Sequence, residues 1–162
     1  MAFDVKKRKR ELIEENVKKV PMASRGELIA KICILSMFIA RSILILVEVI
    51  YSASTETKIS IWSYVLLIPF LFITFMVYDG NKSLVYIPMI SAPARLIYHF
   101  TAVLPTVATE SVSALTVITL LSLAIQFFAS IVMSASTKCD VYFTAMQKVN
   151  LKIRSEMIGG KK

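Results

Sequence analysis

The sequence contains few of the side chains that build metal and catalytic centres. It has one histidine and two cysteines in 162 residues, which is too few for a multi-histidine metal or haem site or for a Cys/His zinc cluster. A phosphate-binding P-loop, a Gly-x-Ser-x-Gly nucleophile motif and a His-Glu-x-x-His zinc motif are also absent. We therefore expect a protein that is not an enzyme and that carries no metal or cofactor.

Charged residues are scarce as well, at 19% of the chain, compared with about 25% in an average soluble domain. Apolar residues reach 56% and are concentrated in blocks of about the 20 residues that a bilayer-spanning helix needs. The sequence predicts four transmembrane helices at residues 25–51, 59–78, 84–104 and 111–135. The second and fourth have no formal charge and no polar face wide enough to meet water, which argues against a soluble four-helix bundle. The predicted fold is an all-α integral membrane protein with a single domain over residues 1–162.

The 19 lysine and arginine residues are distributed unevenly around these spans. Sixteen lie before or at the start of the first span, after the fourth, or between the second and third, whereas only Lys58 lies in the other two loops. Because cytoplasmic loops carry an excess of basic residues, both termini are predicted to be cytoplasmic. We expect a bacterial-type plasma (inner) membrane protein in which Cys33 and Cys139 lie on the reducing side and stay free.

Short amphipathic helices are predicted at both cytoplasmic ends. The N-terminal segment, residues 1–24, has a basic cluster that is expected to contact anionic lipid head groups or to orient the first span, and not to bind nucleic acid; it comprises Lys6, Lys7, Arg8, Lys9 and Arg10. Apolar residues at helical spacing follow, and Pro21 is expected to end that helix. Ser24 and Glu27 form a capping-box pattern at the start of the first span.

The C-terminal segment, residues 136–162, has an apolar residue at every third or fourth position: Tyr142, Met146, Val149, Ile153 and Met157. This spacing predicts a helix with one apolar stripe, which ends at Gly159-Gly160. The stripe could pack on the N-terminal helix, on lipid or on another subunit, and the spacing does not distinguish among them. The expected partners are therefore the bilayer with its anionic head groups and a second copy or another membrane protein.

Ionisable residues interrupt the predicted first and third spans, where charge is costly. Arg41 and Glu48 are seven residues apart and share one helix face, and Arg95 and His99 are four apart and share another. Glu48 is the only carboxylate inside a predicted span, so one counter-ion serves two arginines. A polar cavity, an anionic ligand or a neighbouring subunit would supply the missing charge. The alternative is that both arginines reach the interface or pair with backbone carbonyls freed at prolines.

The fourth predicted span has a small and polar stripe, formed by Thr119, Ser122, Gln126 and Ala129, which is typical of close helix packing or of a ligand-facing surface. The candidate intramembrane binding site comprises Arg41, Glu48, Arg95, His99 and Gln126. The leading hypothesis is a transporter or channel component for a small anionic solute or a proton. The alternative is a non-transporting scaffold or regulatory subunit that holds partners through its amphipathic termini.

Overall fold

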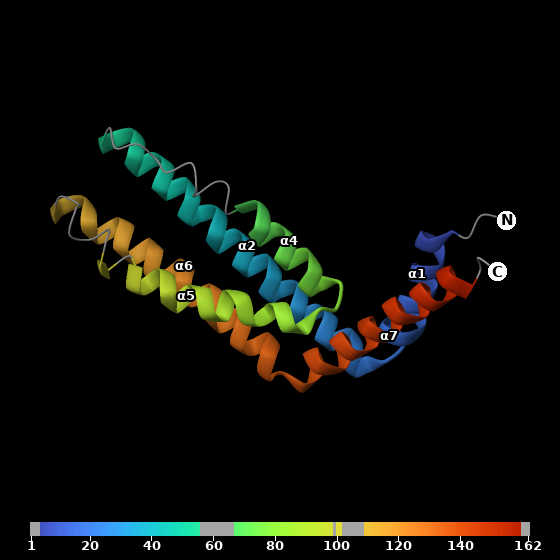
Figure 1. The fold of residues 1–162 in the computed structure, drawn as a ribbon. Helices are drawn as coiled ribbons and strands as arrows, with labels where there is room; N and C mark the ends of the chain where they lie inside the picture. Colours follow the sequence, from blue (N-terminus) through green and yellow to red (C-terminus); the bar gives the residue numbers. More distant parts are fainter. Residues whose placement is uncertain (1–3, 56–66, 99, 102–108, 160–162) are drawn as a thin grey trace.

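The computed structural model describes residues 4–55, 67–98, 100–101 and 109–159, and every regular element in these ranges is helical. Figure 1 shows two parts. The first, the bundle, is formed by α2 (Pro21–Thr55), α4 (Leu67–Tyr78), α5 (Tyr86–Tyr98) and α6 (Thr109–Ala135). The second, the foot, is formed by α1 (Val5–Ile13), the π-helical turn η1 (Glu14–Lys18) and α7 (Thr137–Gly159). The start of α1 and the end of α7 lie together at one end of the molecule.

The centre of the bundle is the pair formed by α2 and α6, which run in opposite directions along each other (Figure 1). One contact joins α2 to α6, and a second joins α2 to α7, the helix that follows α6. The hydroxyl of Ser130 lies 3.6 Å from the sulfur of Met37, and the thiol of Cys139 lies 3.8 Å from the carbonyl oxygen of Gly26. α4 lies beside α2, and α5 packs along α6.

The bundle exposes many large apolar residues and buries several polar ones within its apolar core. Large apolar residues are exposed along α2 at positions 28, 32, 35, 39, 43, 46 and 50, and along α6 at positions 117, 121, 125, 128 and 132. Among the residues whose burial the structure describes, the buried polar ones are Arg41, Thr74, Thr119, Ser122, Gln126 and Ser130, all in α2, α4 and α6. A helix surrounded by water would instead place its apolar stripe inside and its polar face outside.

The prediction of an all-helical chain is confirmed for the described residues. Two of their helices are long and apolar enough to cross a bilayer, over Pro21–Val47 and Thr116–Ala135, and Pro69–Tyr78 is a shorter apolar helix. The second predicted span corresponds to α4, with residues 59–66 outside the described residues. The third corresponds to the 3-10 turn η2 (Lys82–Val85) and α5, with residues 99 and 102–104 outside them.

The capping box predicted at the start of the first span is wrong. α2 already begins at Pro21, whose fixed φ and missing N–H suit the first position of a helix. Ser24 lies within the helix, where its amide donates to the carbonyl of Val20 at 2.9 Å. The Glu27 carboxylate pairs with Lys31 one turn later at 2.7 Å instead of turning back to Ser24. Pro21 therefore both ends the N-terminal segment and starts the long helix.

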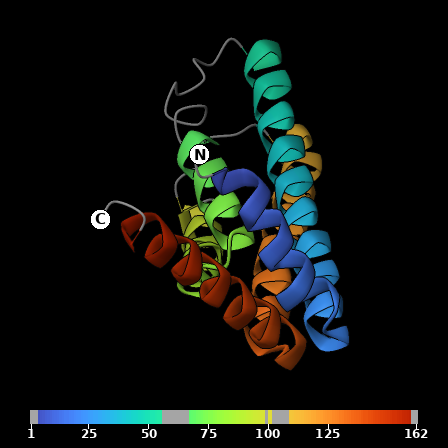
Figure 2. The same ribbon diagram turned by 90° about the vertical axis from the view of Figure 1, so that its right-hand side faces the viewer.

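The apolar stripe of α7 packs against α1 and the base of the bundle. α6 ends at Ala135 and α7 begins at Thr137, so the chain bends and carries α7 across the end of the bundle (Figure 2). Leu12 of α1 is fully buried against Val149 and Ile153. Met157 remains 48% exposed, so the last residue of the predicted stripe is not covered. Val149 and Ile153 thus pack on the N-terminal helix, one of the three partners left open by the spacing, whereas Tyr142 and Met146 pack in a core cluster with residues of α2 and α4.

Candidate functional site

Arg41 lies inside the bundle, with only 1% of its surface exposed. It shares the inward face of α2 with Met37 and Leu44, both buried. Met37 contacts Ser130 of α6. Arg41 lies one turn after Met37 in α2, and Gln126 lies one turn before Ser130 in α6. Because the two helices are antiparallel, Arg41 and Gln126 are at the same level of the bundle. Gln126 is also buried, at 2% exposed. Arg41 thus does not reach the outer surface of the bundle, and this pair of predicted site residues lies at one level.

The buried hydroxyl and amide groups of α6 form a row that we call the polar stripe: Thr119, Ser122, Gln126 and Ser130. The Gln126 amide donates to the carbonyl of Ser122 at 3.2 Å, and the Ser130 hydroxyl donates to the carbonyl of Gln126 at 2.8 Å. Small hydroxyl residues also let two helices approach closely. The stripe predicted from the sequence is therefore buried, and Ser130 contacts α2 directly.

The other predicted members of the site are placed differently. Arg95 is partly exposed in the last turn of α5, a helix that packs along α6 and beside η2. The backbone of Glu48 lies two turns beyond Arg41 in α2, but its side chain is outside the described structure, as is His99. Among the described residues, the structure thus brings Arg41 to the level of Gln126 and places Arg95 on the helix packed along α6.

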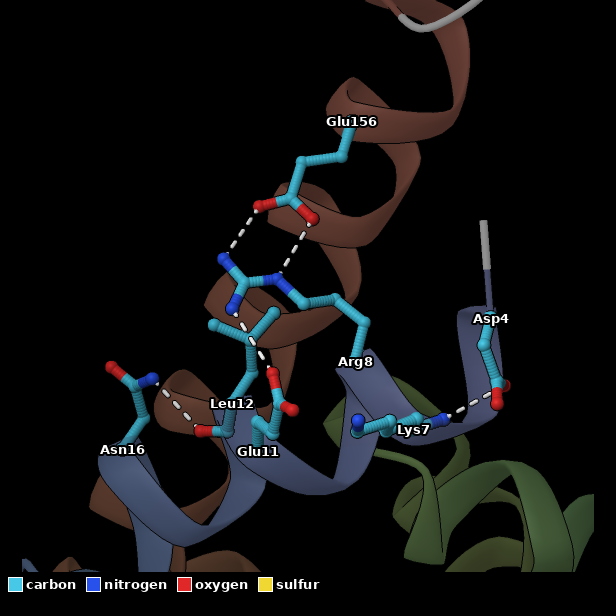
Figure 3. Close-up of polar contacts among 7 residues, drawn as sticks. All are labelled: Asp4, Lys7, Arg8, Glu11, Leu12, Asn16 and Glu156. Carbon is cyan, nitrogen blue, oxygen red and sulfur yellow. Dashed lines mark hydrogen bonds and ion pairs between the residues drawn. The ribbon is translucent and has the colours of Figure 1, made fainter. Parts of the chain in front are cut away.

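The basic cluster of the N-terminal segment divides into two groups. Arg8 makes a two-bond contact with the Glu156 carboxylate of α7, both bonds at 3.0 Å (Figure 3), and this contact lowers the pKa of Glu156. Lys9 pairs with Asp79, which follows α4, at 2.5 Å. Arg8 therefore joins α1 to α7 within the foot, and Lys9 joins the foot to the bundle. The members of the cluster that point into solvent are Lys6, Lys7 and Arg10.

Three side chains of α7 hold the turn that follows α4, and we call them the α7 clamp. They donate hydrogen bonds to three successive carbonyls: Tyr142 to Tyr78 at 2.6 Å, Asn150 to Asp79 at 2.7 Å and Gln147 to Gly80 at 3.4 Å. The last carbonyls of a helix lack partners within it, and α7 supplies a donor to the carbonyl of Tyr78, the last residue of α4, and to those of the two turn residues that follow. Burial raises the pKa of Tyr142, which keeps its hydroxyl protonated as a donor.

The clamped turn depends on glycine. Gly80 has φ of +103°, which other residues rarely adopt, and a Cβ added there would lie 2.6 Å from the Cβ of Met146. Lys82, just beyond the turn, pairs with Asp140 of α7. Sequence reasoning missed this contact, and its only local signal is the Asp79-Gly80 turn pair. The residues that hold the turn lie more than 60 positions later in the chain.

Comparison with protein-family models, curated proteins and solved structures found no match. Function must therefore be inferred from the residues and their arrangement. Two features stand out: the polar stripe level with Arg41 inside the bundle, and the clamped turn where the bundle meets the foot.

Proposed function

We propose that the bundle spans a membrane and that the interface of α2 and α6 is the polar site of a transporter or channel component. The solute is a small anion or a proton. The observation that carries the proposal is a buried arginine level with Gln126 of a polar stripe, on helices whose outward faces are apolar. Lipid suits such outward faces, and ionisable groups inside a membrane protein mark solute and proton paths.

The distribution of charge supports an orientation for this protein. The foot carries exposed basic residues on both of its helices, among them Lys6, Lys7, Arg10, Lys148, Lys152 and Arg154. Basic residues accumulate on the cytoplasmic side of membrane proteins. We therefore assign the foot and both termini to the cytoplasm, with the four predicted spans in the plasma membrane and α4 and α5 as parts of the second and third.

The described conformation supports a site that is closed toward the foot. Arg41 would attract an anion, and Gln126 can both donate and accept hydrogen bonds. On the foot side of this level, Met37 and Met133 are 1% and 0% exposed and fill the interface. Methionine is flexible and unbranched, so these two side chains can change rotamer at little cost. Opening would therefore require α2 and α6 to separate at the two methionines.

The scaffold hypothesis loses part of its basis. It assigned partner binding to the amphipathic termini, but their apolar stripes pack on each other, with Leu12 of α1 buried against Val149 and Ile153 of α7. A partner would have to use the basic surface or the outward faces of the bundle instead. This arrangement favours the transport proposal over a scaffold that acts through its ends.

Membrane insertion is tested first, by extracting membranes that contain the full-length protein with alkaline carbonate. A bilayer-spanning protein stays in the pellet, whereas recovery in the supernatant would contradict the proposal at its base. Labelling of single cysteines introduced at Lys6 and Ser155, in intact and in opened cells, tests the orientation. Both positions should react only after the cells are opened.

Transport is tested in liposomes that contain the purified protein, with chloride, nitrate, phosphate and protons as probes. Arg41→Gln removes the charge, and Gln126→Leu removes the amide at the same level. Arg25→Gln is the matched control, since Arg25 is an exposed arginine of the same helix. We expect the first two variants to reduce the flux of one probe by about tenfold or more, the loss that one charge-assisted contact implies. Arg25→Gln should leave it unchanged.

Thermal unfolding of the same preparations separates transport from folding. If Arg41→Gln and Gln126→Leu unfold near the wild-type temperature but lose flux, the polar site acts on a solute. If wild-type liposomes show no flux of any probe above empty liposomes, or if both variants keep full flux, the transport proposal is wrong.

A further inference from the structure

A cavity of about 460 Å³ opens at the α7 clamp, lined by the end of α4, the turn that follows it and α7. Its lining combines polar and apolar groups. Asn81 and Arg154 line it with an amide and a guanidinium, and Phe75, Met76 and Leu151 line it with apolar atoms. A cavity lined by a cation together with aromatic and aliphatic groups matches a ligand with a charged head and an apolar tail.

The polar side of the cavity favours an anion. Asp79 is a carboxylate in its wall, but Lys9 pairs with it at 2.5 Å and offsets its charge. Arg154 is exposed, and within the described part of the chain it forms no ion pair with a carboxylate. Arg154, Asp79 and the Lys9 that pairs with Asp79 together carry one net positive charge, and the planar guanidinium of Arg154 can bind phosphate oxygens through two hydrogen bonds.

The apolar side of the cavity continues along the outward face of α4. Phe75 is 66% exposed, and Phe72, one turn closer to the centre of the bundle, is 62% exposed. Tyr78 and Tyr86 are also exposed at this end of α4 and α5. Tyrosines are enriched where a membrane meets water. The cavity thus lies at the boundary between the apolar surface of the bundle and the charged surface of the foot.

We propose that this cavity binds the phosphate head group of an anionic phospholipid. Arg154 contacts the phosphate, and an acyl chain follows Leu151, Phe75 and Phe72 toward the centre of the bundle. The inference rests on the proposed membrane insertion, but it concerns a different site from the polar stripe. A soluble phosphate ester presents the same head-group chemistry to Arg154, although it would leave the apolar wall without a partner.

Native mass spectrometry of the full-length protein in detergent tests this site, with phosphatidylglycerol and phosphatidylcholine of identical acyl chains as probes. Arg154→Gln removes the cation from the cavity. Lys152→Gln is the matched control, because Lys152 is an exposed cation of the same helix and does not line the cavity. We expect the wild type to prefer phosphatidylglycerol. Arg154→Gln should weaken that binding roughly fivefold, the contribution of one basic residue at a membrane surface, with less than about twofold change in the control.

Glycerol 3-phosphate as a competitor distinguishes the source of the phosphate. Failure to displace phosphatidylglycerol supports the lipid, because the acyl chain then contributes to binding. Tighter binding of glycerol 3-phosphate than of phosphatidylglycerol overturns the lipid assignment. Equal affinity for both phospholipids, or equal losses in Arg154→Gln and Lys152→Gln, overturns the site itself. These outcomes leave the flux assays on Arg41 unaffected, and carbonate extraction tests membrane insertion independently.

Discussion

Gly26 lies where α2 and α7 pack tightly, and the effect of adding one methyl group there follows from the distances. A Cβ at this position would lie 2.0 Å from the carbonyl oxygen of Lys138 and 2.9 Å from the Cβ of Tyr142. Ordinary contacts of this kind are 3.4–4 Å long. Gly26→Ala therefore requires the two helices to move apart by about 1 Å or more, because a backbone carbonyl cannot rotate out of the way.

Two opposing effects set the magnitude of this change. Replacing a glycine inside a helix by alanine normally stabilises the protein by about 0.5–1 kcal/mol. Overpacking of a well-packed contact costs about 1–3 kcal/mol, and the upper part of that range applies where the obstacle is backbone. We expect a net loss of roughly 1–2 kcal/mol in the free energy of unfolding. At about 2–4 °C per kcal/mol for a chain of this size, the melting temperature falls by roughly 2–8 °C.

The two native thiols provide the assay. Cys33 and Cys139 are free and buried, so a dye that becomes fluorescent on reacting with thiols reports unfolding as the temperature rises. Cys139 also contacts the carbonyl of Gly26 at 3.8 Å, so early labelling of Cys139 would reveal local separation of α2 from α7. Arg25→Ala, at the neighbouring exposed position, is the control and should shift the melting temperature only slightly. A melting temperature of Gly26→Ala equal to or above that of the wild type would refute the close contact.

Three further predictions concern the foot. Tyr142→Phe removes the donor to the partly buried carbonyl of Tyr78 and should cost about 0.5–1.5 kcal/mol in thermal unfolding, the net contribution of one hydrogen bond; an unchanged melting temperature would count against the clamp. Leu12→Ala should weaken the packing of α1 on α7 by about 2–5 kcal/mol. Amide exchange should then become faster than in the wild type, with a larger increase in α1 than in α6. Arg8 lowers the pKa of Glu156, so their contribution to stability is present above the usual glutamate pKa and is lost as the pH falls through the lowered value. Protease cleavage near α1 should therefore increase on acidification in the wild type, and that increase should be smaller in Glu156→Gln.

The helical stripes could be predicted because their information is local. The spacing of Tyr142, Met146, Val149 and Ile153 requires only the period of an α-helix, and all four residues are buried. The capping box at Ser24 and Glu27 was a local pattern too, but Pro21 started the helix earlier. In this helix the earlier start signal, Pro21, determines where the helix begins.

The candidate site could be predicted only in part. The depth of Arg41 in an apolar run and the polar stripe of α6 are both visible in the sequence. Their alignment depends on the antiparallel contact of Met37 with Ser130, residues 93 positions apart. Arg95 was grouped with Arg41 from its depth alone, whereas α5 packs along α6. The position of a residue along a helix can be read from the sequence, but the helix that packs beside it cannot.

The sequence by itself determined that the chain is helical, which residues share a helix face, and that its basic residues gather at the ends and in one loop. These properties follow from periodicity and composition, which act over a few turns. Only the tertiary structure decided that α7 packs on α1, that the α7 clamp holds the turn after α4, and that Arg41 faces inward level with Gln126. An apolar face gains free energy on any apolar surface, so it does not specify its partner. Chain connectivity, the close approach at Gly26 and directional hydrogen bonds to the turn made that choice.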